Sequence, residues 1–285
     1  MDEEFGMGGI ITFTSDFGAR DPYVGEVKGV IKACAPEAEI IDITHHIDPG
    51  NLMAASFVLA GSCRYFPDGT VHLAVVDPGV GTDRAILIVM TSRFIFIGPD
   101  NGVLYRASCV DGVKSIHVLD VKRFLAMLRS VYERNSVVKH IVSMGLSATF
   151  HGRDLFAPLA GYVFSGFDLE RVSDKVESMV SLGWEEAEVH GGKIFGRVLY
   201  IDRFGNLITN IASTLVGEGD EVFVKKGTEM VSAGNLVKTY SQGTPGFPIA
   251  LIGSRGYLEI AVNRGSARKL LGASCGDEVL VLKKR

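Results

Sequence analysis

The chain has 285 residues, of which 47% are hydrophobic and 22% are charged. Such a length and apolar content suit one large or two modest domains and argue against disorder. The formal net charge is −4 and Lys and Arg are scattered, so no basic patch points to a nucleic-acid partner. Met1–Gly8 lacks the pattern of a secretory signal, and no apolar run is long enough to span a bilayer. We therefore expect a cytoplasmic protein without a membrane partner.

The first part of the chain alternates between strand and helix patterns. Strands are expected at 9–15, 39–44, 70–76, 85–91 and 93–97, and helices at 23–34, 51–65, 121–133 and 154–161. Alternation of this kind indicates βαβ units, and ligands gather outside the carboxyl ends of their parallel strands. We predict an α/β fold, with an N-terminal α/β domain over 1–180 built on a largely parallel central sheet.

Beyond about residue 180 the pattern changes to short apolar runs between Gly-rich turns. These runs are 191–201, 207–211, 221–225, 248–252, 257–262 and 278–282. Many short strands with few helices are typical of a small barrel or sandwich. We predict a C-terminal β-barrel domain over 181–285.

Two polar motifs in the first domain could carry chemistry. Asp77 follows a strand that should be buried, and the loop Asp77–Arg84 places a carboxylate and a guanidinium around two glycines. Taken alone, this motif is weak and is better explained as a turn with a surface ion pair. His151 stands beside Arg153 and Asp154 at a loop-to-helix junction, and its imidazole can exchange protons near neutrality. The six other histidines lack such company and are interpreted as structural: His45, His46, His72, His117, His140 and His190.

Further polar residues stand at strand ends and turns. Asp16 and Asp21 bracket the first loop, where a carboxylate often binds ribose hydroxyls, although Asp21 could instead cap the following helix. In the second domain, the segments 201–206 and 254–256 place polar side chains beside glycines, which hairpin turns alone would explain.

Several common chemistries lack their motifs. The four cysteines are widely spaced without a CxxC pair, and no HExxH is present, so neither a disulfide framework nor a metal site is expected. There is no GxSxG, and no base is placed near Ser15 or Ser254, which disfavours a covalent nucleophile. GxGxxG and GxxxxGK[ST] are also missing, so no nucleotide cofactor is expected.

Six motifs in order give a more specific indication than any one of them. They are TSDFG, DPGVGTDR, GPDNG, HGRD, IDRFGN and SRGYLEIAVN. In this order they resemble the S-adenosylmethionine hydroxide adenosyltransferase family over essentially the whole chain. The resemblance implies an α/β domain followed by a β-barrel, and a homotrimer with active sites between neighbouring subunits. It also implies cleavage of S-adenosylmethionine by water into adenosine and methionine, without a cofactor.

The resemblance also implies roles for individual residues. Asp77, Arg84 and His151 would surround and activate the attacking water, and Asp16, with Asp21 on the same loop, would bind the ribose side of the substrate. Asp202, Ser254 and Arg255 would hold the methionine amino and carboxylate groups, while Asn206 and the backbone around Arg264 would bind adenine.

Three alternatives remain open. Related enzymes that attach fluoride or chloride to the same carbon have a tyrosine at the position of Asp77, so this aspartate favours water. A non-catalytic sensor would have no use for Asp77, Arg84 and His151 together. On a purely structural interpretation, the residue preferences of turns alone would explain every motif. The chain also departs from the halogenases at Gly50, where they have an aromatic residue, and the stretch 122–142 is longer than expected.

Overall fold

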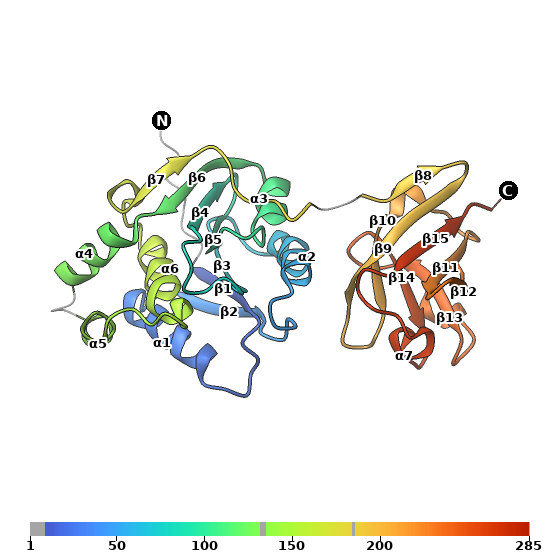
Figure 1. Cartoon of the computed structure of the whole chain (residues 1–285), viewed down its shortest axis with the longest axis horizontal. Coiled ribbons are helices and arrows are strands. Elements are labelled where there is room, and N and C mark those ends of the chain that lie inside the picture. Colours follow the sequence, from blue (N-terminus) through green and yellow to red (C-terminus); the bar gives the residue numbers. More distant parts are fainter. Residues whose placement is uncertain (1–8, 132–134, 184–185, 285) are drawn as a thin grey trace. The chain divides into compact units, whose positions relative to one another are not determined.

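The computed structural model describes residues 9–131, 135–183 and 186–284. The chain forms two compact units, Met1–Leu182 and Gly183–Arg285 (Figure 1). Met1–Gly8, on which the argument against a secretory signal depends, lies outside the described residues, as do the last two residues of the helix expected over 121–133.

The N-terminal unit alternates strands and helices along most of its length. Its elements are β1 (Ile10–Ser15), α1 (Tyr23–Cys34), β2 (Glu39–Thr44), α2 (Leu52–Ser62), β3 (Val71–Val75), β4 (Ile86–Thr91), β5 (Ile95–Pro99), α3 (Tyr105–Asp111), β6 (Val113–Leu119), α4 (Val121–Val131), α5 (Ser136–Met144), a π-helical turn (Gly152–Phe156), α6 (Ala157–Phe164) and β7 (Ser173–Val176). Short 3₁₀ turns occupy Cys63–Tyr65 and Leu169–Arg171.

The sheet of this unit is mixed rather than largely parallel. Its strand order is β2-β1-β3-β5-β4-β6-β7, with parallel pairing from β2 to β5 and antiparallel pairing from β5 to β7. Only residues 92–94 separate β4 from β5, and a connection this short permits a hairpin but no parallel crossover. The α/β class is confirmed, and the expectation of a largely parallel sheet holds only for its first half.

Side chains alternate between the two faces of this sheet. Ile11 and Phe13 point to the face covered by α1, α4, α5 and α6, where the main apolar core lies (Figure 1). Thr12 and His72, both fully buried, point to the opposite face. There the imidazole of His72 stacks on Phe96, with ring centroids 5.1 Å apart, and its Nδ1 lies 2.7 Å from Thr12 Oγ1.

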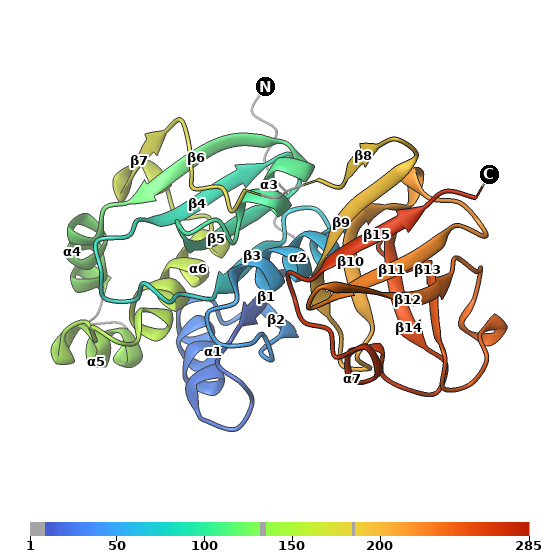
Figure 2. The ribbon, with the colours of Figure 1, turned by 45° about the vertical axis from the view of Figure 1, so that its right-hand side comes forward.

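The C-terminal unit is an antiparallel, nearly closed barrel (Figure 2). Its elements are β8 (Glu188–His190), β9 (Lys193–Ile201), β10 (Leu207–Ala212), β11 (Glu221–Lys226), β12 (Glu229–Asn235), β13 (Pro248–Ile252), β14 (Tyr257–Val262), α7 (Ala267–Leu271) and β15 (Glu278–Leu282), with 3₁₀ turns at Ser213–Leu215 and Tyr240–Gln242. The strand order is β12-β11-β15-β9-β10-β14-β13, and a bridge between Leu236 and Ala250 brings the two outer strands together. The predicted C-terminal barrel is confirmed.

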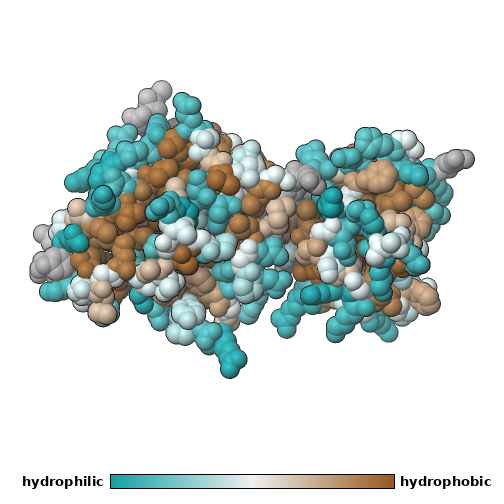
Figure 3. All heavy atoms as spheres, in the orientation of Figure 1, coloured by the Kyte–Doolittle hydropathy of each residue, from teal (hydrophilic) through white to brown (hydrophobic). Residues whose placement is uncertain are grey.

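Polar and apolar residues are interspersed over the face of each unit shown in Figure 3. Within the described ranges, no helix combines the length and the apolar character needed to cross a membrane.

Candidate active site

Asp77 and Arg84 form a buried ion pair within one loop. The loop leaves the end of β3 and folds back through two turns, with Val80 N donating to Asp77 O at 3.1 Å and Thr82 N donating to Gly79 O at 3.1 Å. Arg84 Nε thereby lies 2.9 and 2.8 Å from the two carboxylate oxygens of Asp77, and Nη2 donates to Oδ2. The side chains are 6% and 11% exposed, so this is no solvated surface pair.

Gly81 lets this loop approach the segment that carries the candidate histidine. Its φ is +80°, and a Cβ atom at this position would lie 2.5 Å from the carbonyl oxygen of Ala148. Only glycine combines this backbone conformation with so close an approach of another backbone. The contact joins the loop 77–84 to the residues just before His151.

His151 completes a cluster with the ion pair. Its Nδ1 lies 3.0 Å from Arg84 Nη2. A guanidinium can only donate, so Nδ1 accepts this hydrogen bond, and the neutral imidazole then carries its proton on Nε2. Burial, reinforced by the charge of Arg84, lowers the pKa of His151 below its ordinary value and favours this neutral form.

The neighbours of His151 hold its segment in place. Asp154 is 1% exposed and accepts hydrogen bonds from Ser147 N at 2.8 Å and Arg153 Nε at 2.7 Å. Arg153 also contacts Glu26 of α1 at 3.1 Å. Of the titratable residues in the HGRD motif, His151 hydrogen-bonds to the Asp77–Arg84 pair, while Arg153 and Asp154 stabilise the π-helical turn.

The cluster offers both donors and an acceptor to a water molecule. Arg84 uses Nε and Nη2 toward its two partners, and no residue in the described ranges pairs with its Nη1. Nη1 and the Nε2–H of His151 are donors suited to a developing hydroxide, and the Asp77 carboxylate can accept a proton. No group of three His, Cys, Asp or Glu side chains within the described ranges is arranged to hold a metal ion.

Asp16 and Asp21 lie in different environments. Asp16 directly follows β1, and its Oδ2 accepts a hydrogen bond from Gly50 N at 2.8 Å. Asp21 is exposed and lines a cavity of about 650 Å³ together with Asp42 and His45. The N-cap of α1 is Pro22, so the alternative reading of Asp21 as the cap is wrong.

In the C-terminal unit, Asp202 organises the loop that presents Asn206. Its Oδ1 accepts from Phe204 N and Asn206 N, both at 2.9 Å, and its Oδ2 accepts from Asn206 Nδ2 at 2.9 Å. Gly205, with a φ of +83°, packs directly against Ser266, which ties this loop to the turn after β14. Asp202 therefore has a structural function of its own, whatever ligand it also binds.

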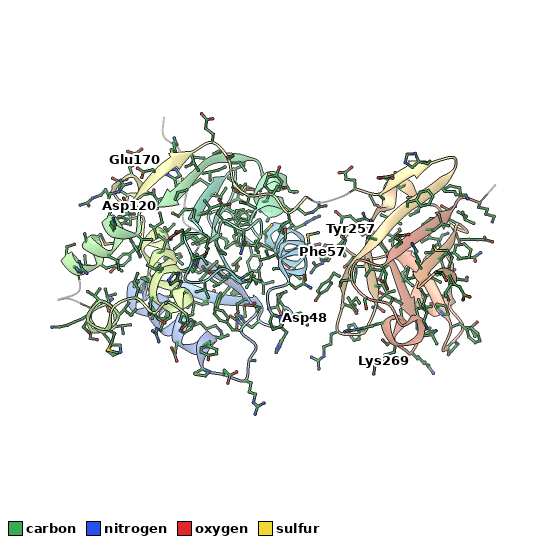
Figure 4. All side chains as sticks on the ribbon, in the orientation of Figure 1. Asp48, Phe57, Asp120, Glu170, Tyr257 and Lys269 are labelled. Atoms are coloured by element: carbon green, nitrogen blue, oxygen red, sulfur yellow. The ribbon has the colours of Figure 1, made fainter. Side chains whose placement is uncertain are left out.

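A cavity of about 780 Å³ brings Asn206 and Arg264 together. Arg264 has a φ of 59°, the one positive φ outside glycine in the described residues, and such backbone strain is often retained at functional sites. The cavity is lined by Phe204, Asn206, Tyr240, Val262, Asn263, Arg264, Gly265, Ser266 and Lys269. Lys269, labelled in Figure 4, comes from α7.

Ser254 and Arg255 are not among these lining residues. They lie in the hairpin turn between β13 and β14, which Gly256 N closes by donating to Gly253 O at 2.9 Å. The proposed methionine-binding residues therefore do not gather in the cavity of Asn206.

Two features escaped sequence reading. Tyr240 donates a hydrogen bond to Glu259, a carboxylate that is 7% exposed and whose pKa is raised by burial and by Asp202. His45, interpreted as structural, is 7% exposed and lies against Ser15 and Asp42. The sequence signal for His45 was present, since Asp42 precedes it by three residues, but its contact with Ser15 depends on the pairing of β1 with β2.

A mixed α/β sheet followed by a β-barrel, with an Asp-Arg-His cluster beyond the carboxyl end of a central strand, defines a two-domain protein with a polar candidate active site. The chain belongs to the SAM hydroxide adenosyltransferase family, because the models of its N-terminal and C-terminal domains match residues 11–173 and 196–280.

Individual relatives agree with this assignment. An "(R)-S-adenosyl-L-methionine hydrolase" from Thermus thermophilus is 37% identical over 95% of this chain and 99% of its own length. A "Fluorinase" from Actinopolyspora mzabensis is more distant, at 26% identity over 90% of this chain and 91% of its own. The crystal structure of a conserved protein from Thermotoga maritima matches with a TM-score of 0.83 and 38% identity, covering 96% of this chain and 100% of that one.

Proposed function

We propose that this protein hydrolyses S-adenosyl-L-methionine to adenosine and L-methionine by attack of water on the 5′ carbon. The observation that carries the proposal is the buried cluster of Asp77, Arg84 and His151, which combines two donors and an acceptor at one point. The relative at 37% identity, which bears the name of a hydrolase acting on this substrate, supports it.

In the proposed reaction the water oxygen bonds to C5′ as the C5′–S bond breaks. The electron pair of that bond stays on sulfur, so the sulfonium leaves as the neutral thioether of methionine, and the water gives up one proton to the Asp77 carboxylate. Arg84 Nη1 and the Nε2–H of His151 stabilise charge that develops on the oxygen, and Asp77 accepts the hydrogen bond that orients the water. Because bulk water has a pKa of about 15.7, we favour proton loss during attack over a preformed hydroxide.

The remaining predicted residues would bind the three parts of the substrate. Asp16, with Asp21 on the same loop, is assigned to the ribose. Asn206 and the backbone around Arg264 are assigned to adenine, which suits the cavity they share. The methionine end is assigned to Asp202, Ser254 and Arg255, and no cofactor is required.

We further propose a homotrimer with active sites between neighbouring subunits, which the family resemblance implies. Light scattering coupled to size-exclusion chromatography would test this, and the mass of a monomer would overturn it. A cytoplasmic location is proposed because reduced thiols, such as that of the exposed Cys109, suit a reducing compartment.

The reaction is tested by incubating the protein with S-adenosylmethionine in oxygen-18 water, with and without chloride, followed by mass spectrometry of the nucleoside. The two sulfonium epimers should be tested separately, because the hydrolase from Thermus thermophilus is named for the (R) form. Adenosine labelled at the 5′ oxygen is expected. Formation of 5′-chloro-5′-deoxyadenosine would indicate a halogenase instead, and recovery of unchanged substrate from both epimers would indicate a sensor.

A further inference from the structure

A buried histidine outside the proposed catalytic cluster lies at the centre of a polar chain in the N-terminal unit. His45 directly follows β2, and its Nδ1 is 2.8 Å from Ser15 Oγ. Its Nε2 is 3.1 Å from Asp42 Oδ1, which makes an electrostatic contact between the two side chains. Asp42 in turn pairs with Lys28 Nζ at 2.6 Å.

This series of polar contacts ends on the loop that presents Asp16. Ser15 precedes Asp16 directly and is fully buried, and Gly18 N donates to the carbonyl oxygen of His45 at 2.7 Å. His45 therefore holds the loop on both sides of Asp16, through its side chain at Ser15 and through its backbone at Gly18. The carboxylate of Asp16 is fixed from the same segment, since Gly50 N donates to its Oδ2 at 2.8 Å.

The group of Ser15, His45 and Asp42 contains the residue types of a nucleophilic triad, but its geometry excludes that chemistry. Ser15 is 0% exposed, so no substrate atom can reach its hydroxyl. The edge of the imidazole also packs on Phe13, with centroids 4.7 Å apart, which holds the ring in place. A rigid imidazole whose Nδ1 contacts a loop anchor is suited to orienting its neighbours.

We propose that His45 is a positioning residue, which fixes the Asp16 loop so that the Asp16 carboxylate can bind the ribose hydroxyls of the nucleoside. This inference rests on the proposed function, in which Asp16 is the ribose ligand. It assigns His45 a function in substrate discrimination, where the sequence suggested only a structural histidine.

The experiment compares the binding of adenosine and 2′-deoxyadenosine by isothermal titration calorimetry. The dissociation constant of 2′-deoxyadenosine divided by that of adenosine measures the contribution of the 2′-hydroxyl. Asp16→Asn, which alters the proposed ribose ligand itself, gives the lowest ratio expected. His45→Ala should reduce the ratio by about tenfold, the value of one hydrogen bond to a charged group. His45→Asn should largely restore it, because the asparagine amide can occupy the position of Nδ1 opposite Ser15.

The next residue provides a matched control. His46 is exposed, and its backbone N donates to Thr44 Oγ1 at 3.1 Å, a hydrogen bond that His46→Ala retains. His46→Ala should therefore leave the ratio unchanged. If His45→Ala fails to fold, as judged by circular dichroism, Ser15→Ala removes the same side-chain contact from the other strand.

The outcomes separate the two proposals. An undiminished ratio in folded His45→Ala, or equal weakening of both nucleosides, would overturn the positioning function and leave the proposed hydrolysis intact. If the wild-type protein binds neither nucleoside nor S-adenosylmethionine, the proposed function fails and the inference fails with it.

Discussion

Lowering the pH from 8 to 4.5 should destabilise the N-terminal unit through His72. This imidazole is fully buried, and burial, with a smaller contribution from Arg93, lowers its pKa from 6.5 to about 3. Between these two values the unfolded chain binds a proton that the folded unit excludes. The stabilising contribution of His72 is therefore complete above pH 6.5 and decreases as the pH falls toward 3.

The size of the effect follows from the same two pKa values. At pH 4.5, two units below the pKa of His72 in the unfolded chain, the unfolding free energy is lower by about 2.7 kcal/mol. Each pH unit contributes about 1.36 kcal/mol. His72→Phe keeps an aromatic ring against Phe96 but cannot be protonated. Because other groups also titrate, the informative quantity is the difference in unfolding free energy between the variant and the wild type at each pH.

The assay is urea unfolding followed by far-UV circular dichroism between pH 8 and 4.5. The wild type should lose about 2.7 kcal/mol relative to His72→Phe over this range. Thr12→Val, which removes the hydroxyl beside Nδ1 but keeps the imidazole, should retain the wild-type pH dependence. A difference between His72→Phe and the wild type that does not vary with pH would refute the reasoning.

Three further predictions concern the polar clusters. Asp77→Asn should slow single turnover by about 10²–10³-fold while the affinity for substrate is kept, since Asp77 acts on the water; a large loss of affinity at normal turnover would contradict the assignment. Arg84→Met should raise the pKa of His151, because it removes a charge that lowers it, and an NMR titration of the imidazole should show a midpoint at higher pH than in the wild type. Tyr240→Phe should cost about 1–3 kcal/mol of unfolding free energy by leaving Glu259 buried without its donor, and adding Glu259→Gln should recover part of that loss in a double-mutant cycle.

Much of the fold could be predicted because its elements carry a clear hydrophobic period. The ranges of α1, β2, β13, β14 and β15 agree with the pattern of their apolar residues. Several elements were not predicted, among them α3, β6, α5, β7, β8, β12 and α7. Three of them show the physical reason: α3 is short, α5 lies in the stretch 122–142 that is longer than expected, and β12 contains Ser, Gly and Asn in place of an apolar alternation.

The candidate site was predictable in its residues but not in its contacts. The motifs named Asp77, Arg84 and His151, whereas the hydrogen bond between Arg84 and His151 joins positions 67 residues apart. The tautomer of His151 follows from that contact, and its neutral form is favoured by burial and by the charge of Arg84. His45 was missed because its partner Ser15 lies 30 residues away on the paired strand, and local charge patterns carry no information about such a neighbour.

The approach of Gly81 to Ala148 also bears on how distant members of this scaffold can be recognised. A side chain at position 81 would collide with the backbone whatever chemistry the surrounding residues perform, because the restriction is steric. Asp77, by contrast, is restricted by the ion pair between its side chain and that of Arg84, not by the space around its main chain. In a search for related sequences, we therefore expect Gly81 to mark the shared architecture, and the proposed function predicts that the residue at position 77 distinguishes one reaction from another.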